Sequence, residues 1–111
     1  QAVVDIALQE AGFEVLIACD GNEAFDLLGS RIGELNGLIT DIKLGDGPNG
    51  WEIARRAREL SSGLPVLYVS GTSEHQWASE GVPGSLIISK PFAPTQIVVA
   101  ISSLLFATEP P

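Results

Sequence analysis

Sulfur-containing and basic residues are scarce in this sequence. It has one cysteine, Cys19, no methionine, one histidine, and six Lys and Arg residues against 14 Asp and Glu. A single cysteine cannot form an internal disulfide, so we expect a reducing compartment, the cytoplasm. The formal charge of −8 disfavours contact with a nucleic-acid backbone and fits a cation site or a partner with a basic surface.

Long apolar runs are missing as well. No run approaches the roughly 18 residues that a bilayer span requires, and no basic segment precedes an apolar one at the N-terminus, so we expect neither membrane contact nor a signal peptide. The 111 residues are 45% hydrophobic, which is enough for a folded core. We predict one domain over residues 1–106, with residues 107–111 as a tail or linker.

The most informative stretch is the apolar run 37–41, Gly-Leu-Ile-Thr-Asp, which ends on a carboxylate. A continuous apolar run bounded by turn residues predicts a buried strand. The glycine-rich segment 45–50 that follows predicts a loop, and a helical pattern begins at Trp51. Asp41 is therefore expected at the carboxyl end of a strand, where open α/β sheets place their functional groups.

Helical and strand patterns alternate along the whole chain. Helices are predicted at 2–11, around 24–28, and at 51–60, 74–80 and 94–105; strands are predicted at 13–18, 37–41, 65–70 and 85–89. This alternation predicts an α/β fold with a parallel sheet covered by helices on both faces. Because the chain opens on a helix, we expect it to be a fragment without its first, central strand. Such a sheet would have an open slot and two unpaired edges, which upstream residues or another chain would have to fill.

Four features then coincide: Asp41 ends one strand, Ser70 ends the next, Lys90-Pro91-Phe92 ends the last, and Asp20-Gly21-Asn22-Glu23-Ala24 opens a helix. In this order and spacing they resemble the receiver domain of two-component response regulators, over nearly the whole chain. The resemblance implies a flavodoxin-like, doubly wound sheet with strand order 2-1-3-4-5. It also implies a cis Lys90–Pro91 bond.

The function that the resemblance implies is transfer of a phosphoryl group to Asp41 from the phosphohistidine of a sensor kinase or a phosphotransfer protein. Lys90 and Ser70 would contact phosphoryl oxygens, and Mg²⁺ would take Asp41 and the backbone carbonyl of Lys43 as ligands. Lys43 and Thr72 would flank the site and tune the loss of phosphate. A homodimer through the last two helices and the last strand is also expected. The domain would be a signalling switch, not an enzyme beyond its own phosphorylation and dephosphorylation.

The sequence departs from the family pattern in two places. The acidic pair that ends the family's first strand is absent from this chain, so outer magnesium ligands are missing. The switch position three residues before Lys90, usually aromatic, is Ile87. Both departures suit an alternative, a receiver-like protein-binding module that works without phosphorylation. A small enzyme on a flavodoxin-like fold is disfavoured, because the 45–50 loop lacks the G-x-G-x-x-G spacing.

The remaining polar and aromatic residues have simpler interpretations. Asp20 and Glu23 are predicted to cap a helix, and Ser70 can also cap the helix that follows it. Loop or surface positions are expected for Asp46 and His75, a core-edge position for Cys19, and packing or partner contacts for Trp51 and Trp77.

Overall fold

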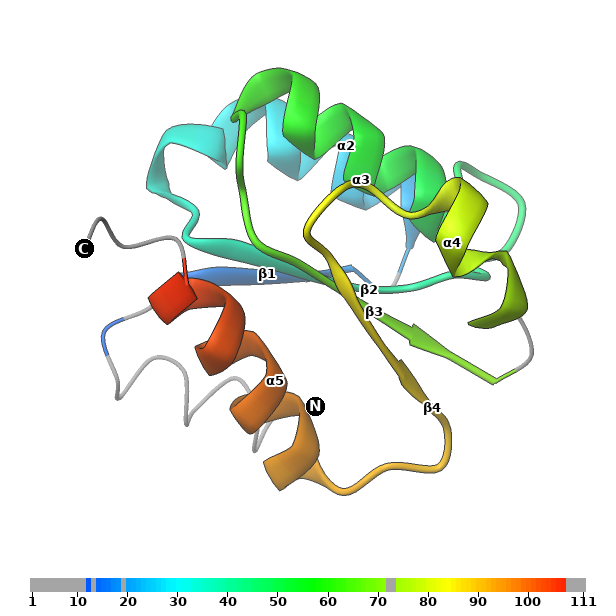
Figure 1. The fold of residues 1–111 in the computed structure, drawn as a ribbon. Helices are drawn as coiled ribbons and strands as arrows, with labels where there is room; N and C mark the ends of the chain where they lie inside the picture. The colour runs from blue at the N-terminus through cyan, green and yellow to red at the C-terminus, as the bar shows by residue number, and fades with distance from the viewer. Residues whose placement is uncertain (1–11, 13, 19, 72–73, 108–111) are drawn as a thin grey trace.

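The computed structural model describes residues 12, 14–18, 20–71 and 74–107. Its elements follow the predicted alternation (Figure 1). In chain order they are β1 (Val15–Ala18), α2 (Gly21–Arg31), the 3-10 helix η1 (Ile32–Glu34), β2 (Gly37–Asp41), α3 (Gly50–Leu60), β3 (Val66–Ser70), the 3-10 helix η2 (Glu74–Gln76), α4 (Trp77–Glu80), β4 (Leu86–Ser89) and α5 (Pro94–Ala107). The predicted helix 2–11 and the tail from residue 108 lie outside the described residues.

The four strands of the described residues form one parallel sheet in the order β1-β2-β3-β4. The predicted parallel α/β sheet is therefore confirmed, but the predicted open slot is wrong. β1 pairs directly with β2, with Val15 opposite Gly37 and Ala18 opposite Thr40. This pairing gives both strands hydrogen-bonding partners, whereas a gap would have left two edges unpaired. The reversal that the strand order 2-1-3-4-5 implies is not seen among these strands.

Helices cover both faces of the sheet. α2 and α3 lie over one face and α5 lies over the other (Figure 1). Side chains along β3 alternate between the two layers, because Val66 and Tyr68 join the core beneath α2 and α3 while Leu67 and Val69 join the core beneath α5. The continuous burial of β2 and β3 is thus the consequence of a sheet that is covered twice.

Side-chain caps fix where the helices on the first face begin. Asp20 is the N-cap of α2, and its Oδ1 accepts a hydrogen bond from the Glu23 backbone N–H at 2.9 Å, which confirms Asp20 as a cap. Asn49 and Glu52 form a complete capping box at the start of α3. The cap at Asn49 ends the glycine-rich loop at a defined residue and so fixes the path of the chain that leaves Asp41.

Among the described residues, no helix combines the length and the apolar character needed to cross a membrane. α4 is the shortest α-helix of this part of the chain, with four residues, and it follows η2, which has three. The predicted helix 74–80 is therefore two short helical turns of different type. Because so short a helix makes few internal hydrogen bonds, its position depends on contacts with neighbouring elements.

Candidate functional site

Asp41 is the last residue of β2, and its carboxylate forms an ion pair with the ammonium group of Lys90. The two residues are 49 positions apart in the sequence. The sheet brings them together because β2, β3 and β4 are parallel and their carboxyl ends lie at the same end of the sheet. About a third of the Asp41 side chain is exposed to solvent, 32%, so the carboxylate is reachable from outside.

Ser70 lies at the same edge, between the strands that carry the ion pair. It is opposite Ser89 in the β3–β4 register, and its carbonyl oxygen accepts a hydrogen bond from the Lys90 backbone N–H at 2.8 Å. Ser70 is almost fully buried. Asp41 itself is opposite Val69, one residue before Ser70. The acid, the hydroxyl residue and the amine therefore converge on one end of the sheet.

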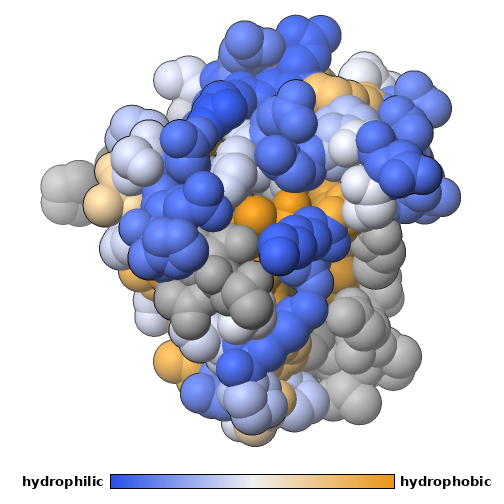
Figure 2. All heavy atoms as spheres, turned by 90° about the vertical axis from the view of Figure 1, so that its right-hand side faces the viewer, coloured by the Kyte–Doolittle hydropathy of each residue, from blue (hydrophilic) through white to orange (hydrophobic). Residues whose placement is uncertain are grey.

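This end of the sheet forms the face shown in Figure 2, toward which β3 and β4 point in Figure 1. The face is mostly hydrophilic, and a patch of hydrophobic atoms lies at its centre.

The start of α3 lies directly against the backbone of Asp41. The Gly50 N–H donates to the Ile42 carbonyl oxygen at 2.7 Å, and a Cβ atom at Gly50 would lie only 2.2 Å from the Asp41 carbonyl oxygen. The 45–50 loop also packs tightly on α2, because a Cβ at Gly21 would lie 2.1 Å from the Pro48 carbonyl oxygen. Gly50 is a functional position that was not predicted from the sequence. Its signal is a glycine at the first helical position directly after a good cap, where local propensity does not require one.

The sequence matches the response regulator receiver domain family over residues 1–102. The chain belongs to this family. It is 34% identical over 100 residues to the transcriptional regulatory protein CusR of Escherichia coli K12, which covers 88% of this chain and 43% of CusR. It is also 30% identical over 103 residues to the response regulator receiver protein CpdR of Brucella abortus, which covers 91% of this chain and 83% of CpdR. The chain thus spans less than half the length of CusR.

Solved structures agree with this assignment. A response regulator receiver protein from Sinorhizobium medicae WSM419 superposes with a TM-score of 0.84 at 40% identity, covering 97% of this chain and 86% of that protein. The receiver domain of the hybrid histidine kinase CckA superposes with a TM-score of 0.70 at 25% identity, covering 94% of this chain and 87% of that domain. The chain is therefore a response regulator receiver domain of two-component systems.

The other site residues predicted for the receiver domain are placed as follows. The Lys43 backbone N–H lies 3.4 Å from Asp41 Oδ1, at the outer limit of a hydrogen bond, and the Lys43 side chain is exposed. Ile87 is half-buried and packs against the core beneath α2 and α3. The Lys90–Pro91 peptide bond is cis, as the resemblance implies. Thr72 lies outside the described residues.

A divalent cation would find few ligands around Asp41. No cluster of three or more Asp, Glu, His or Cys side chains occurs within residues 12, 14–18, 20–71 and 74–107. Asp41 supplies one carboxylate, and the Lys43 carbonyl follows two residues later. Both are oxygen ligands of the kind that Mg²⁺ takes alongside phosphate oxygens and water, and they supply only part of its octahedral coordination.

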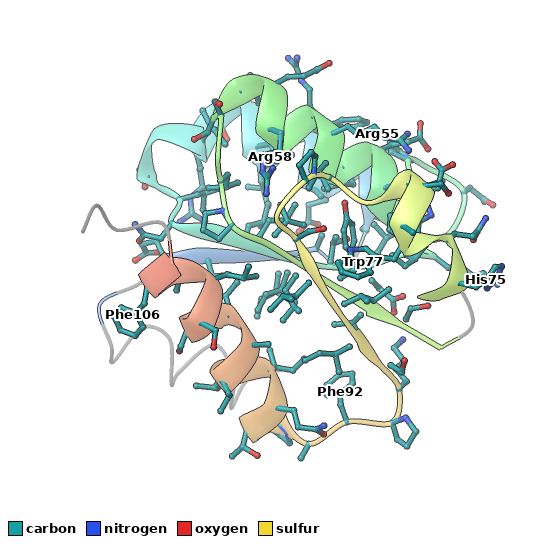
Figure 3. All side chains as sticks on the ribbon, viewed as in Figure 1. Arg55, Arg58, His75, Trp77, Phe92 and Phe106 are labelled. Carbon is teal, nitrogen blue, oxygen red and sulfur yellow. The ribbon has the colours of Figure 1, made fainter. Side chains whose placement is uncertain are left out.

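Four residues with simpler interpretations lie in the kinds of position predicted for them, namely His75, Asp46, Trp51 and Trp77. His75 points outward from η2 and is exposed (Figure 3). Asp46 is exposed in its loop. Trp51 is buried, with its ring centre 4.7 Å from that of Tyr68. Trp77 is half-buried, and its indole N–H donates to Ser85 Oγ at 2.9 Å. Cys19 lies outside the described residues.

Proposed function

We propose that Asp41 is the phosphoacceptor of this receiver domain and that it takes a phosphoryl group from the phosphohistidine of a sensor kinase or a phosphotransfer protein. The observation that carries the proposal is the ion pair between Lys90 and Asp41 at the edge where Ser70 also ends its strand. An Asp41 oxygen bonds to phosphorus as the bond from phosphorus to the histidine nitrogen breaks, and the imidazole leaves with a proton.

The surrounding residues have separate roles in this transfer. Lys90 places a compact positive charge where the phosphoryl oxygens accumulate negative charge. Ser70 donates a hydrogen bond to one of those oxygens. Mg²⁺, held by Asp41 and the Lys43 carbonyl, would neutralise further charge on the phosphoryl group when bound. Thr72 and the Lys43 side chain would flank the phosphoryl group and set how quickly water removes it.

Phosphorylation would act as a switch of contacts. The added charge draws Ser70 toward the phosphoryl group and changes the balance between two arrangements of the chain that follows β3. Ile87 would tune that balance from the neighbouring strand.

The surface of α4, β4 and α5 is the proposed contact for a second copy of this domain. Leu86, Val99 and Phe106 are the exposed large hydrophobic residues of the described part of the chain. A shallow hollow of about 370 Å³ lies between β4 and α5, lined by Ile88 and Val99 among others. Apolar side chains around a hollow favour association with another apolar surface.

The full-length protein incubated with acetyl phosphate and Mg²⁺ provides the test. Intact-mass spectrometry is expected to show a gain of one phosphate in the wild type and none in Asp41→Asn. No gain in either protein would contradict the phosphoacceptor role and would favour a receiver-like module that acts by contact alone. A gain in both proteins would show that another residue is the acceptor.

A further inference from the structure

Residues 80–85, which are the last residue of α4 and its connection to β4, are held by side chains of two other elements, α3 and β3. From α3, Arg55 forms an ion pair with Glu80, and Arg58 Nη1 donates to the Pro83 carbonyl oxygen at 2.6 Å. From β3, the Tyr68 hydroxyl accepts a hydrogen bond from the Val82 backbone N–H at 3.1 Å. Figure 3 shows Arg55, Arg58 and Trp77 arranged around this connection.

Val82 is the centre of these contacts. Its N–H is bonded to Tyr68, and its carbonyl oxygen accepts from Ser85 Oγ at 2.6 Å, which in turn accepts from the Trp77 indole at 2.9 Å. Val82 is buried, so leaving its backbone N–H and carbonyl oxygen without these partners would destabilise the fold. Since α4 has only four residues, hydrogen bonds from these side chains hold the segment in place, whereas backbone hydrogen bonds do so in the longer helices and strands.

Tyr68 also lies close to the site. It is two residues before Ser70 on the same strand, so both side chains project to the same side of the sheet. Tyr68 is fully buried and packs on Trp51 of α3. Burial raises the pKa of Tyr68, so its phenol stays protonated at physiological pH. Because closely packed interiors deform little, we expect a displacement at Ser70 to be passed to Tyr68 along the strand.

We infer that Tyr68 is a positioning residue that couples the phosphorylation state of Asp41 to residues 80–85 through its hydrogen bond with Val82. The inference rests on the proposed function. In the unphosphorylated protein the bond fixes the segment. When Ser70 moves toward a phosphoryl group, the Tyr68 hydroxyl shifts from Val82 and the segment is released. Because coupling is reciprocal, breaking this bond by mutation favours the arrangement that accepts phosphate.

The first test needs no phosphate. Tyr68→Phe keeps the ring and removes the hydroxyl, while the matched control Leu67→Val trims the adjacent buried residue on the opposite face of β3. Amide hydrogen exchange at Val82 is expected to be about tenfold faster in Tyr68→Phe, the change that the loss of one buried hydrogen bond produces. Leu67→Val should leave the exchange rate at Val82 unchanged. Urea unfolding measures the global stability of both variants, so that a local effect can be told from a global one. Equal exchange in Tyr68→Phe and wild type would overturn the anchoring role.

The second test measures phosphorylation of the full-length protein by acetyl phosphate. Tyr68→Phe is expected to be phosphorylated about fivefold faster than wild type, because a larger fraction of this variant is in the arrangement that accepts phosphate, and Leu67→Val at the wild-type rate. A rate in Tyr68→Phe equal to or below that of Leu67→Val would overturn the coupling, because a merely structural tyrosine gives that result. If the wild type gains no phosphate, the proposed function and the coupling both fail, whereas the exchange at Val82 still decides the anchoring role by itself.

Discussion

Two lysines near Asp41 carry the same charge in different positions. The Lys90 ammonium group is paired with the Asp41 carboxylate, whereas the Lys43 side chain is exposed and reaches Asp41 only through its backbone. We expect Lys90→Ala to slow phosphorylation by acetyl phosphate on the order of 10²-fold, the effect of losing one charge-stabilising donor. The measurement is the initial rate of phosphate gain by mass spectrometry.

Lys43→Ala is the matched control for this substitution, since it removes the same charge from the same end of the sheet. It is expected to leave the rate of phosphate gain near wild type and to change only the lifetime of the phosphorylated protein. Both variants should unfold at nearly the wild-type urea concentration, because ion pairs this exposed contribute little to stability. Equal losses of phosphorylation rate in the two variants would contradict a specific role for Lys90.

Tyr68 gives the domain a pH dependence in the alkaline range. Burial raises the pKa of Tyr68 above its ordinary value of 10.0. A group whose pKa is raised by folding contributes stability below its unfolded pKa and loses that contribution as the pH rises through the folded pKa. The free energy of unfolding of the wild type should therefore fall relative to Tyr68→Phe as the pH rises above about 10. A difference between the two proteins that is constant over this range would contradict the burial of the phenol.

At the scale of single elements, the start of α3 is the most constrained. Gly50→Ala would place a Cβ within 2.2 Å of the Asp41 carbonyl oxygen. We expect it to lower the free energy of unfolding by about 2–3 kcal/mol, because neither backbone can move without disturbing the strand end or the cap at Asn49. Urea unfolding measures the change.

Gly29 in α2 is the control for the same chemical substitution. A Cβ at Gly29 meets nothing within 4 Å, and its φ is not in the left-handed region. Gly29→Ala is therefore expected to raise the free energy of unfolding by about 0.5–1 kcal/mol, the ordinary gain of alanine over glycine in a helix. Equal effects at the two positions would show that α3 does not lie against Asp41 as closely as described.

Elements whose patterns are local were predictable from the sequence. The strand ending at Asp41 follows from an apolar run bounded by turn residues. The cap at Asp20 follows from an aspartate placed directly before a helical pattern. The contact between Asp41 and Lys90 was predictable only through the resemblance to receiver domains. The order of the strands in the sheet decides which strand ends are neighbours, and local patterns do not reveal that order.

Contacts that depend on the path of a loop were not predictable. The Tyr68–Val82 bond joins a strand to a segment with no regular structure, and no pattern in either segment indicates the other. The expected slot in the sheet was wrong for a related reason. It was inferred from the helical pattern at the start of the chain, because the first strand of a doubly wound sheet is usually central. The pairing of β1 with β2 instead follows from the requirement that backbone groups find partners.

For the whole molecule, the apolar surface of α4, β4 and α5 predicts self-association. Val99 is 64% exposed on α5. We expect Val99→Glu to abolish any dimer that forms on phosphorylation, because a carboxylate cannot be buried unpaired against an apolar surface. Analytical ultracentrifugation of the phosphorylated protein measures this. Ser30→Glu adds the same charge on the exposed side of α2 and should leave the dimer intact, and a dimer that survives Val99→Glu would exclude this surface as the contact.

The most direct test of the central claim locates the phosphoryl group on the chain. Borohydride reduces an aspartyl phosphate to homoserine, so treatment of the phosphorylated full-length protein marks the acceptor residue, and peptide sequencing by mass spectrometry identifies it. The predicted result is homoserine at position 41. It should be absent without phosphorylation and less abundant in Lys90→Ala. Homoserine at Asp20, Asp46 or another carboxylate, with position 41 unmodified, would contradict the assignment of Asp41 as the phosphoacceptor.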